Sequence, residues 1–120
     1  MLIPPGLRVF FAVEPVDMRG SFYALSNHVR AALREDPRAG HLFVFLGKRR
    51  NLVKLLFWDR SGWCILAKRL EVGRFSFPVD IAHDVAQVEV DFATLTMLLE
   101  GIDLRGATRR KAFEAPTFVK

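Results

Sequence analysis

The middle of the chain contains three consecutive apolar runs, residues 42–46, 52–58 and 63–70. A basic loop, Gly47–Asn51, separates the first two runs, and the turn-forming segment Asp59–Gly62 separates the second from the third. Runs of this length that are rich in Val, Ile, Phe and Trp and bounded by Gly, Asn, Asp and Ser are typical of β-hairpins. The pattern therefore predicts a three-stranded antiparallel meander.

A strand and a helix are predicted before the meander. Residues 8–13 form a short aromatic and β-branched run, which suits a strand. Apolar side chains then recur at the helical spacings of three and four, at Phe22, Leu25, Val29 and Leu33. We expect this helix over residues 22–35, with Ser21 or Asp17 capping its N-terminus, and we expect it to cover one face of the sheet.

Two further strands and a second helix are predicted after the meander. Residues 74–77 alternate and end at Pro78, as an edge strand would, and residues 86–90 form one more short run. Asp91 is placed to cap a helix that stops at Gly101. The apolar side chains along one side of this helix are Phe92, Leu95, Leu98, Leu99 and Ile102.

The turn between the second and third strands of the meander predicts a pairing register. If residues 59–62 form a type I turn with Gly62 left-handed and a bulge, Asp59 lies opposite Trp63. Counting back places Lys54 opposite Lys68, where two like charges repel each other unless an anion or a carboxylate lies between them. A loop one residue longer separates the two lysines.

At 120 residues the chain is long enough for one hydrophobic core and too short for two. The elements predict an α+β fold, a single domain with a mainly antiparallel β-meander of four to five strands, one helix before it and one helix after it. We expect this domain over residues 1–104 and a mobile basic tail over residues 105–120. The run 52–58 is apolar on both faces except at Lys54, which predicts a central strand covered on both sides.

The single cysteine, Cys64, excludes an intrachain disulfide and a cysteine-based metal site. Its place among apolar residues predicts a small buried side chain rather than a reactive thiol. No apolar run approaches the length of a membrane span, and no N-terminal segment has the layout of a signal peptide. We therefore expect a cytoplasmic protein without membrane contact.

Positive charge is concentrated in the meander. The chain has a net charge of +5 and a pI near 10, which favours acidic partners and nucleic acid first. Residues 38–74 hold nine Lys or Arg residues and two acids, whereas residues 79–104 hold six acids and no Lys or Arg. The acidic segment could fold back and neutralise part of the basic face.

No catalytic, metal or cofactor site is predicted. The three histidines, His28, His41 and His83, lack the spacing that gathers a metal ion, and the Gly47 loop lacks the spacing of a phosphate-binding loop. A metal-dependent nuclease would have to rest on Asp17, Asp59 and Glu71. Each of these acids is better explained as a cap, turn or charge-pairing residue, so this is the least favoured interpretation.

Basic residues interleaved with aromatics remain as the candidate site. Phosphate contacts supply affinity independent of sequence, and a β-ribbon is narrow enough to enter a major groove. The candidate nucleic-acid-binding residues are Lys48, Arg49, Arg50, Lys54, Lys68, Arg69 and Arg74. The aromatic residues of the meander could stack on nucleic-acid bases, but aromatics at strand spacing more often belong to the core, and we favour that interpretation. These residues are Phe43, Phe45, Phe57, Trp58 and Trp63.

Several motifs occur in the order and spacing of one family. They are Asp17-Met18-Arg19, the run from Gly40 to Phe45, Lys48-Arg49-Arg50, Lys54, Trp58-Asp59, Gly62, Lys68 to Glu71, Gly73-Arg74-Phe75 and Leu98 to Asp103. With them, residues 7–104 resemble the small TnpB-type accessory protein encoded by the second open reading frame of the sixty-six family of bacterial insertion sequences. The chain departs from the usual pattern at Gly20-Ser21, Tyr23-Ala24 and Phe77-Pro78, which weakens any role for the first loop.

The resemblance implies participation in transposition beside a separate transposase that carries out the chemistry. It leaves two main hypotheses for the mechanism. The basic meander binds DNA at the element ends, or the domain docks on the transposase or on a second copy of itself without touching DNA. A nuclease is the third and weakest hypothesis.

Overall fold

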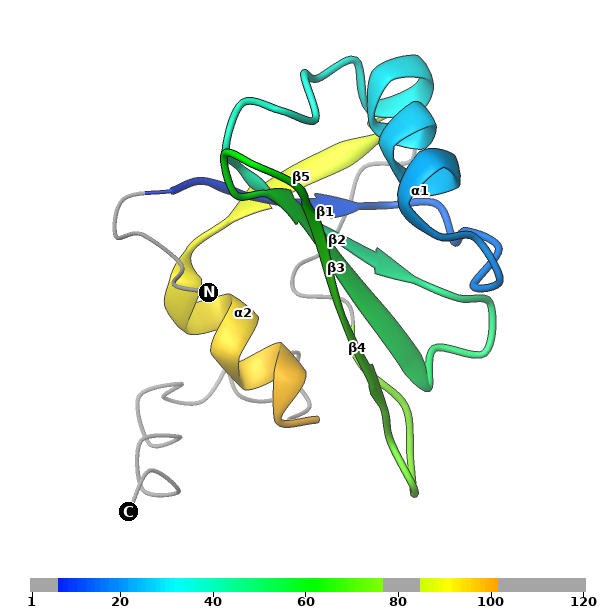
Figure 1. Ribbon diagram of the computed structural model, residues 1–120. Helices are drawn as coiled ribbons and strands as arrows, with labels where there is room; N and C mark the ends of the chain where they lie inside the picture. Colours follow the sequence, from blue (N-terminus) through cyan, green and yellow to red (C-terminus); the bar gives the residue numbers. More distant parts are fainter. Residues whose placement is uncertain (1–6, 77–84, 102–120) are drawn as a thin grey trace.

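Figure 1 shows the computed structural model, which describes residues 7–76 and 85–101. A five-stranded sheet lies between two helical elements, one on each face. The elements are β1 (Val9–Ala12), α1 (Phe22–His28) with its π-helical continuation η1 (Val29–Leu33), β2 (Leu42–Leu46), β3 (Leu52–Trp58), β4 (Trp63–Arg69), β5 (Gln87–Val90) and α2 (Phe92–Leu99). The predicted α+β class is confirmed.

The strand order in the sheet is β4-β3-β2-β1-β5. The predicted meander forms the β2, β3 and β4 half, where all pairs are antiparallel. The β1 strand pairs in parallel with β2, because α1 and η1 carry the chain across one face between them, and β5 pairs antiparallel with β1. The sheet is therefore mostly antiparallel, with β4 and β5 at its two edges.

Two apolar layers cover the two faces of the sheet. The α1 face contains Leu25, Val29 and Leu33 packed over Phe43 and Leu56. On the α2 face, Leu95, Leu98 and Phe75 pack against inward-facing residues of β1, β2 and β3, including Val44, Leu55 and Phe57. The central position predicted for residues 52–58 is confirmed, because cover comes from both sides.

The first helix differs from its prediction at both ends. Leu25, Val29 and Leu33 are buried as predicted, but the Phe22 side chain is 41% exposed. The last turn is π-helical and stops at Arg34, which has a left-handed backbone (φ 60°). A wider turn offsets the angular drift that a strict four-residue spacing produces in a helix of 3.6 residues per turn. Ser21 occupies the cap position without a side-chain cap bond, so the capping prediction is wrong.

The predicted register between β3 and β4 is wrong by one residue. Trp58, not Asp59, lies opposite Trp63, because the loop has four residues and closes with a 3.0 Å bond from the Asp59 N–H to the Gly62 carbonyl. The two indole rings then meet edge to face at 5.0 Å, which is a stabilising cross-strand pair.

This register separates the two lysines. Lys54 lies opposite Ala67 and Lys68 lies opposite Val53, so the two ammonium groups are on different faces of the sheet. The repulsion that the predicted register implied is absent.

The edge strand predicted at residues 74–77 does not form over its described part, residues 74–76. Phe75 is instead fully buried in the α2-side layer, and its N–H donates to the Arg50 carbonyl at 2.6 Å. Burial of the phenyl ring in the core replaces the pairing that an edge strand would offer. Phe77 and Pro78 lie outside the described residues.

The second helix begins and ends as predicted. The Asp91 carboxylate accepts a 2.7 Å hydrogen bond from the Thr94 N–H, and Gly101 follows the helix with a left-handed backbone (φ 80°). Leu95 and Leu98 are buried, whereas Phe92 is more than half exposed; Ile102 lies outside the described residues. Within residues 7–76 and 85–101, no helix has the length and apolar character needed to cross a membrane.

Replacing Asp91 by Ala should lower the free energy of unfolding by about 1 kcal/mol, because an N-terminal N–H of α2 loses its acceptor. Urea unfolding at neutral pH measures this change, and Asp91→Asn, which keeps an acceptor oxygen, should lose much less. The hydrogen bonds from Thr94 hold the pKa of Asp91 below its usual value, so the difference between wild type and Asp91→Ala should shrink as the pH falls below about 4. A difference that persists unchanged at low pH contradicts the capping role.

Candidate functional site

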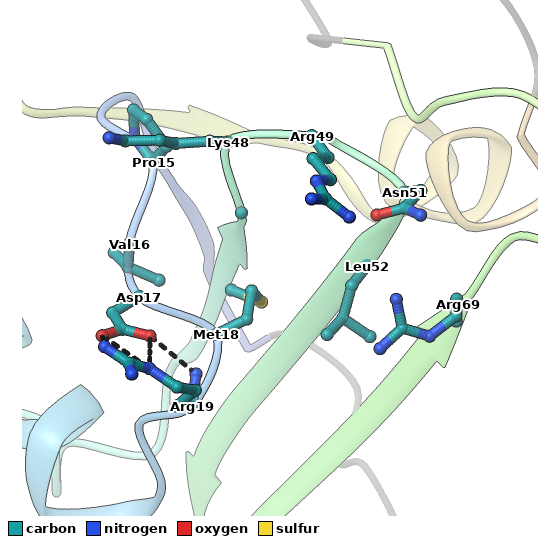
Figure 2. A pocket seen from close by; sticks show the side chains of 11 residues that line it. Pro15, Val16, Asp17, Met18, Arg19, Lys48, Arg49, Asn51, Leu52 and Arg69 are labelled. Carbon is teal, nitrogen blue, oxygen red and sulfur yellow. Dashed lines mark hydrogen bonds and ion pairs between the residues drawn. The ribbon is translucent and has the colours of Figure 1, made fainter.

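A pocket of about 700 Å³ lies where the loop between β1 and α1 meets the hairpin between β2 and β3. Its lining comes from residues 15–19 of the loop, from residues 47–49, 51 and 52 of the hairpin, and from Arg69 at the end of β4. Figure 2 shows the guanidinium groups of Arg49 and Arg69 on the hairpin side and the Asp17–Arg19 pair on the loop side. Four bases and one acid therefore surround a floor that includes Met18 and Leu52.

The loop is held against the sheet by the Lys54 side chain. Its ammonium group is half-buried and donates to the carbonyl oxygens of Met18 at 2.7 Å and Gly20 at 2.9 Å. A further bond runs from the Val16 N–H to the Leu46 carbonyl at 3.0 Å. Two of the three ammonium donors are thus used inside the protein, and Lys54 shapes the wall of the pocket.

Gly47 leaves room for Met18 at the base of the hairpin. A Cβ atom placed on Gly47 would lie 2.6 Å from Met18 Cγ, closer than real side chains approach. The backbone of Gly47 is not in the left-handed region, so space rather than conformation requires glycine here. Met18 and Lys54 together dock the loop onto the hairpin.

Asp17 and Arg19 form a bidentate pair on the loop side. Arg19 Nη2 lies 2.7 Å from Asp17 Oδ2, and the Arg19 Nε and backbone N–H both donate to Asp17 Oδ1. These hydrogen bonds, with the charges of Arg19 and Lys54, hold the pKa of Asp17 well below its usual range. Asp17 therefore stays ionised and orients a side chain that is 91% exposed.

The hairpin tip is braced from behind. Arg50 has a left-handed backbone (φ 59°), its N–H donates to the Gly47 carbonyl at 3.0 Å, and its own carbonyl accepts from Phe75. The Asn51 carbonyl accepts from the Leu70 N–H at 2.8 Å. The chain that follows β4 thus fixes the loop that carries Lys48 and Arg49, both of which are exposed.

The seven predicted binding residues do not form one cluster. Lys48, Arg49 and Arg69 line the pocket, and Arg50 belongs to the same hairpin tip. Lys68 lies on the other face of the sheet, where its ammonium group donates to the Leu99 carbonyl at 2.6 Å. Arg74 is exposed beside the buried Phe75, and Lys54 lies under the loop. Phosphate contact by any of the seven stays a prediction.

Arg19 is a pocket residue that is absent from the seven predicted binding residues. It lies outside the meander, in the Asp17-Met18-Arg19 motif. That motif was the available signal, because an Asp two residues before an Arg can accept from both its backbone and its guanidinium group.

The aromatic residues of the meander are either buried in the core or half-buried at its margin. Phe43, Phe45 and Phe57 are buried, so the prediction that they belong to the core is confirmed. Trp58 and Trp63 are half-buried at the opposite end of β3 and β4 from the pocket. The Arg38 guanidinium group lies 4.7 Å from the Trp58 ring centroid, a cation–π contact.

The carboxylates of the nuclease hypothesis do not converge. Asp59 precedes β4 and Glu71 follows it, and a strand of seven residues spans about 20 Å. The Asp17 carboxylate is paired with the Arg19 guanidinium group. Among residues 7–76 and 85–101, no three His, Cys, Asp or Glu side chains are grouped so that they could hold a metal ion. Burial raises the pKa of the half-buried Cys64 thiol, with a further contribution from Asp59.

Two acids of the acidic segment have partners away from the pocket. Glu89, in β5, pairs with Arg8 at 2.7 Å, and Asp91 caps α2. Asp80, Asp84 and Asp103 lie outside the described residues, so the predicted neutralisation of the basic face is not tested.

Comparison with known proteins gives one family and two similar proteins. Residues 7–109 match the family model described as IS66 Orf2 like protein. The chain is 37% identical over 106 residues to the uncharacterized protein y4hO of Sinorhizobium fredii, covering 87% of this chain and 90% of that relative. It is 36% identical over 116 residues to the uncharacterized protein y4jC of the same organism, covering 95% and 94%. No solved structure gives a significant match.

Replacing Lys54 by Met should lower the free energy of unfolding by about 2 kcal/mol, because two hydrogen bonds from a charged group are lost. Hydrogen exchange should also show faster opening of residues 16–20. The matched control is Lys48→Met, which removes the same charge from an exposed position and should change stability by less than about 0.5 kcal/mol. Equal losses in the two variants would show that Lys54 does not anchor the loop.

The Asp17 carboxyl should titrate below the usual value of about 3.9 in an NMR pH series, because Arg19 favours its ionised form. A carboxyl group whose pKa is lower in the folded than in the unfolded protein stabilises the folded state at pH values above its unfolded pKa. This contribution is lost as the pH falls from the unfolded towards the folded pKa. Arg19→Gln should return the pKa of Asp17 towards 3.9, whereas Arg49→Gln should leave it nearly unchanged. A normal pKa in the wild-type protein would mean that the pair does not form in solution.

Proposed function

Because the chain belongs to the IS66 Orf2-like family of transposition accessory proteins, we propose that it is a non-catalytic factor that binds DNA of its insertion element. The pocket between the β1–α1 loop and the β2–β3 hairpin is the proposed contact site. Its function is to hold the DNA backbone while a separate transposase cuts and joins the strands.

The observation that carries this proposal is that basic side chains from separate parts of the chain line one pocket. Arg19 comes from the loop, Lys48 and Arg49 come from the hairpin tip, and Arg69 comes from the end of β4. Asp17 is the one acid of the lining, and it is already paired with Arg19. A concave surface with excess positive charge attracts phosphate groups and focuses their approach.

The rigidity of the hairpin supports contact with a duplex. Backbone bonds to Leu70 and Phe75 brace the tip from behind, so Lys48 and Arg49 are presented on a fixed loop. A two-stranded ribbon of this kind fits a major groove, and the lysine and arginine side chains beside it then contact phosphates on either side. Such contacts position a protein on DNA without specifying a sequence.

The non-catalytic part of the proposal is supported by the separation of the carboxylates. Asp59 and Glu71 lie at opposite ends of β4, and the Asp17 carboxylate is held by Arg19. This arrangement favours a binding function over metal-dependent strand cleavage.

A second candidate function is docking on the transposase without DNA. The observation in its favour is the exposure of two aromatic side chains at the start of α1, close in sequence to Arg19. Phe22 is 41% exposed and Tyr23 is 81% exposed. Exposed aromatics beside arginines are typical of protein interfaces.

The test is DNA binding by a variant that carries Lys48→Gln, Arg49→Gln and Arg69→Gln, measured across a salt series on element-end DNA. Affinity should fall, and the slope of log K against log salt should become shallower by roughly 3, because about one counterion is released for each phosphate contact. A variant with Arg30→Gln, Arg34→Gln and Arg60→Gln removes the same charge from exposed positions outside the pocket lining and should change the slope much less.

Equal losses in the two triple variants would mean that net charge, and not the pocket, attracts DNA. A wild-type protein that ignores DNA but is retained by the transposase in high salt would support the docking function instead. Tyr23→Ser should then weaken that retention, while the pocket variant leaves it intact.

A further inference from the structure

Among residues 7–76 and 85–101, no strand pairs with the outer edge of the sheet at β4. The strand order places β3 on one side of β4 and no described strand on the other (Figure 1). Its last four residues, Leu66 to Arg69, are all exposed although their side chains alternate between the two faces of the sheet. Leu66, at the midpoint of the strand, is 50% exposed, so an apolar side chain stands at the centre of this edge.

The hydrogen bonds at the two ends of β4 show which backbone groups point outward. The Leu70 N–H donates to Asn51, and the Asp59 N–H donates to Gly62. Because inward and outward groups alternate along an antiparallel strand, the even-numbered residues from Gly62 to Leu70 point their polar groups towards β3. The outward N–H and C=O groups therefore belong to Trp63, Ile65, Ala67 and Arg69.

We propose that two copies of the chain pair through this edge, with their β4 strands antiparallel and a two-fold axis at Leu66. Trp63 of each copy lies opposite Arg69 of the other, and Ile65 lies opposite Ala67. This register pairs all seven residues of β4 and unites the two sheets. Arg69 belongs both to this edge and to the pocket lining, but the pairing of the two β4 strands does not depend on DNA binding.

The charges of the strand select this register. In a parallel, in-register pair, Lys68 and Arg69 would each face the same residue of the other copy, and like charges would repel. In the antiparallel register, Lys68 faces Cys64 and Arg69 faces Trp63, whose ring is half-buried and next to Trp58. The guanidinium group then meets an aromatic ring instead of a cation, and Leu66 meets Leu66.

The register also places both pockets on one face of the dimer. A two-fold axis within an antiparallel pair is perpendicular to the sheet, so the two α1 faces point the same way. Arg69 borders the pocket, and strand geometry separates the two Arg69 residues by roughly 20 Å. One DNA duplex lying on this face could then contact both pockets, a consequence that rests on the proposed function.

A cysteine at position 66 tests the register. Leu66 of one copy would lie opposite Leu66 of the other in a non-hydrogen-bonded pair. The Cα separation of such a pair, about 4.5 Å, suits a disulfide. The purified variant Leu66→Cys in a Cys64→Ala background should therefore form a covalent dimer on mild oxidation without DNA. Wild-type protein should not, because its Cys64 faces Lys68. Tyr23→Cys in the same background controls for random collision.

Light scattering across a concentration series gives the second measurement. Wild-type protein should change from monomer to dimer mass. Ala67→Pro removes an outward N–H and leaves the bonds to β3 intact, so it should weaken the dimer by roughly tenfold or more. Monomer mass at every concentration overturns the proposal, and so does a dimer whose cysteine at 66 cross-links no faster than the cysteine at 23.

Discussion

The pocket depends on one half-buried ammonium group. Lys54 lies on a central strand whose other residues are apolar, and it reaches two carbonyl oxygens of the β1–α1 loop. Burying a charge is unfavourable unless it is hydrogen-bonded, and these carbonyls satisfy that requirement. The same two bonds fix the loop that carries Asp17 and Arg19. The hydrogen bonds that the half-buried Lys54 requires therefore also position the loop side of the candidate site.

Elements defined by local patterns could be predicted from the sequence. The three strands of the meander, the helix capped by Asp91 and the burial of Leu25, Val29 and Leu33 all follow from periodicity and turn chemistry. The features that were missed depend on contacts between distant segments. The register of β3 and β4 depends on a single residue of loop length. A sequence pattern also does not determine whether Phe75 joins an edge strand or enters the core.

The candidate site could be predicted only in part for a related reason. Charge density identified the hairpin tip, but it could not separate Lys48 and Arg49 from Lys54 and Lys68, whose partners are backbone carbonyls. Every residue carries a carbonyl group, so such partners leave no mark in the sequence. Arg19 was overlooked because it lies outside the basic meander in sequence and shares a pocket lining with the hairpin tip only in the folded chain.

The close contact between Gly47 and Met18 has a consequence for the history of the family. Because space excludes a Cβ atom at position 47, the two positions are not free to change separately. An alanine at 47 demands a shorter side chain at 18, and a bulky residue at 18 demands glycine at 47. The loop and the hairpin should therefore evolve as a coupled pair, even though 28 residues of sequence lie between these two positions.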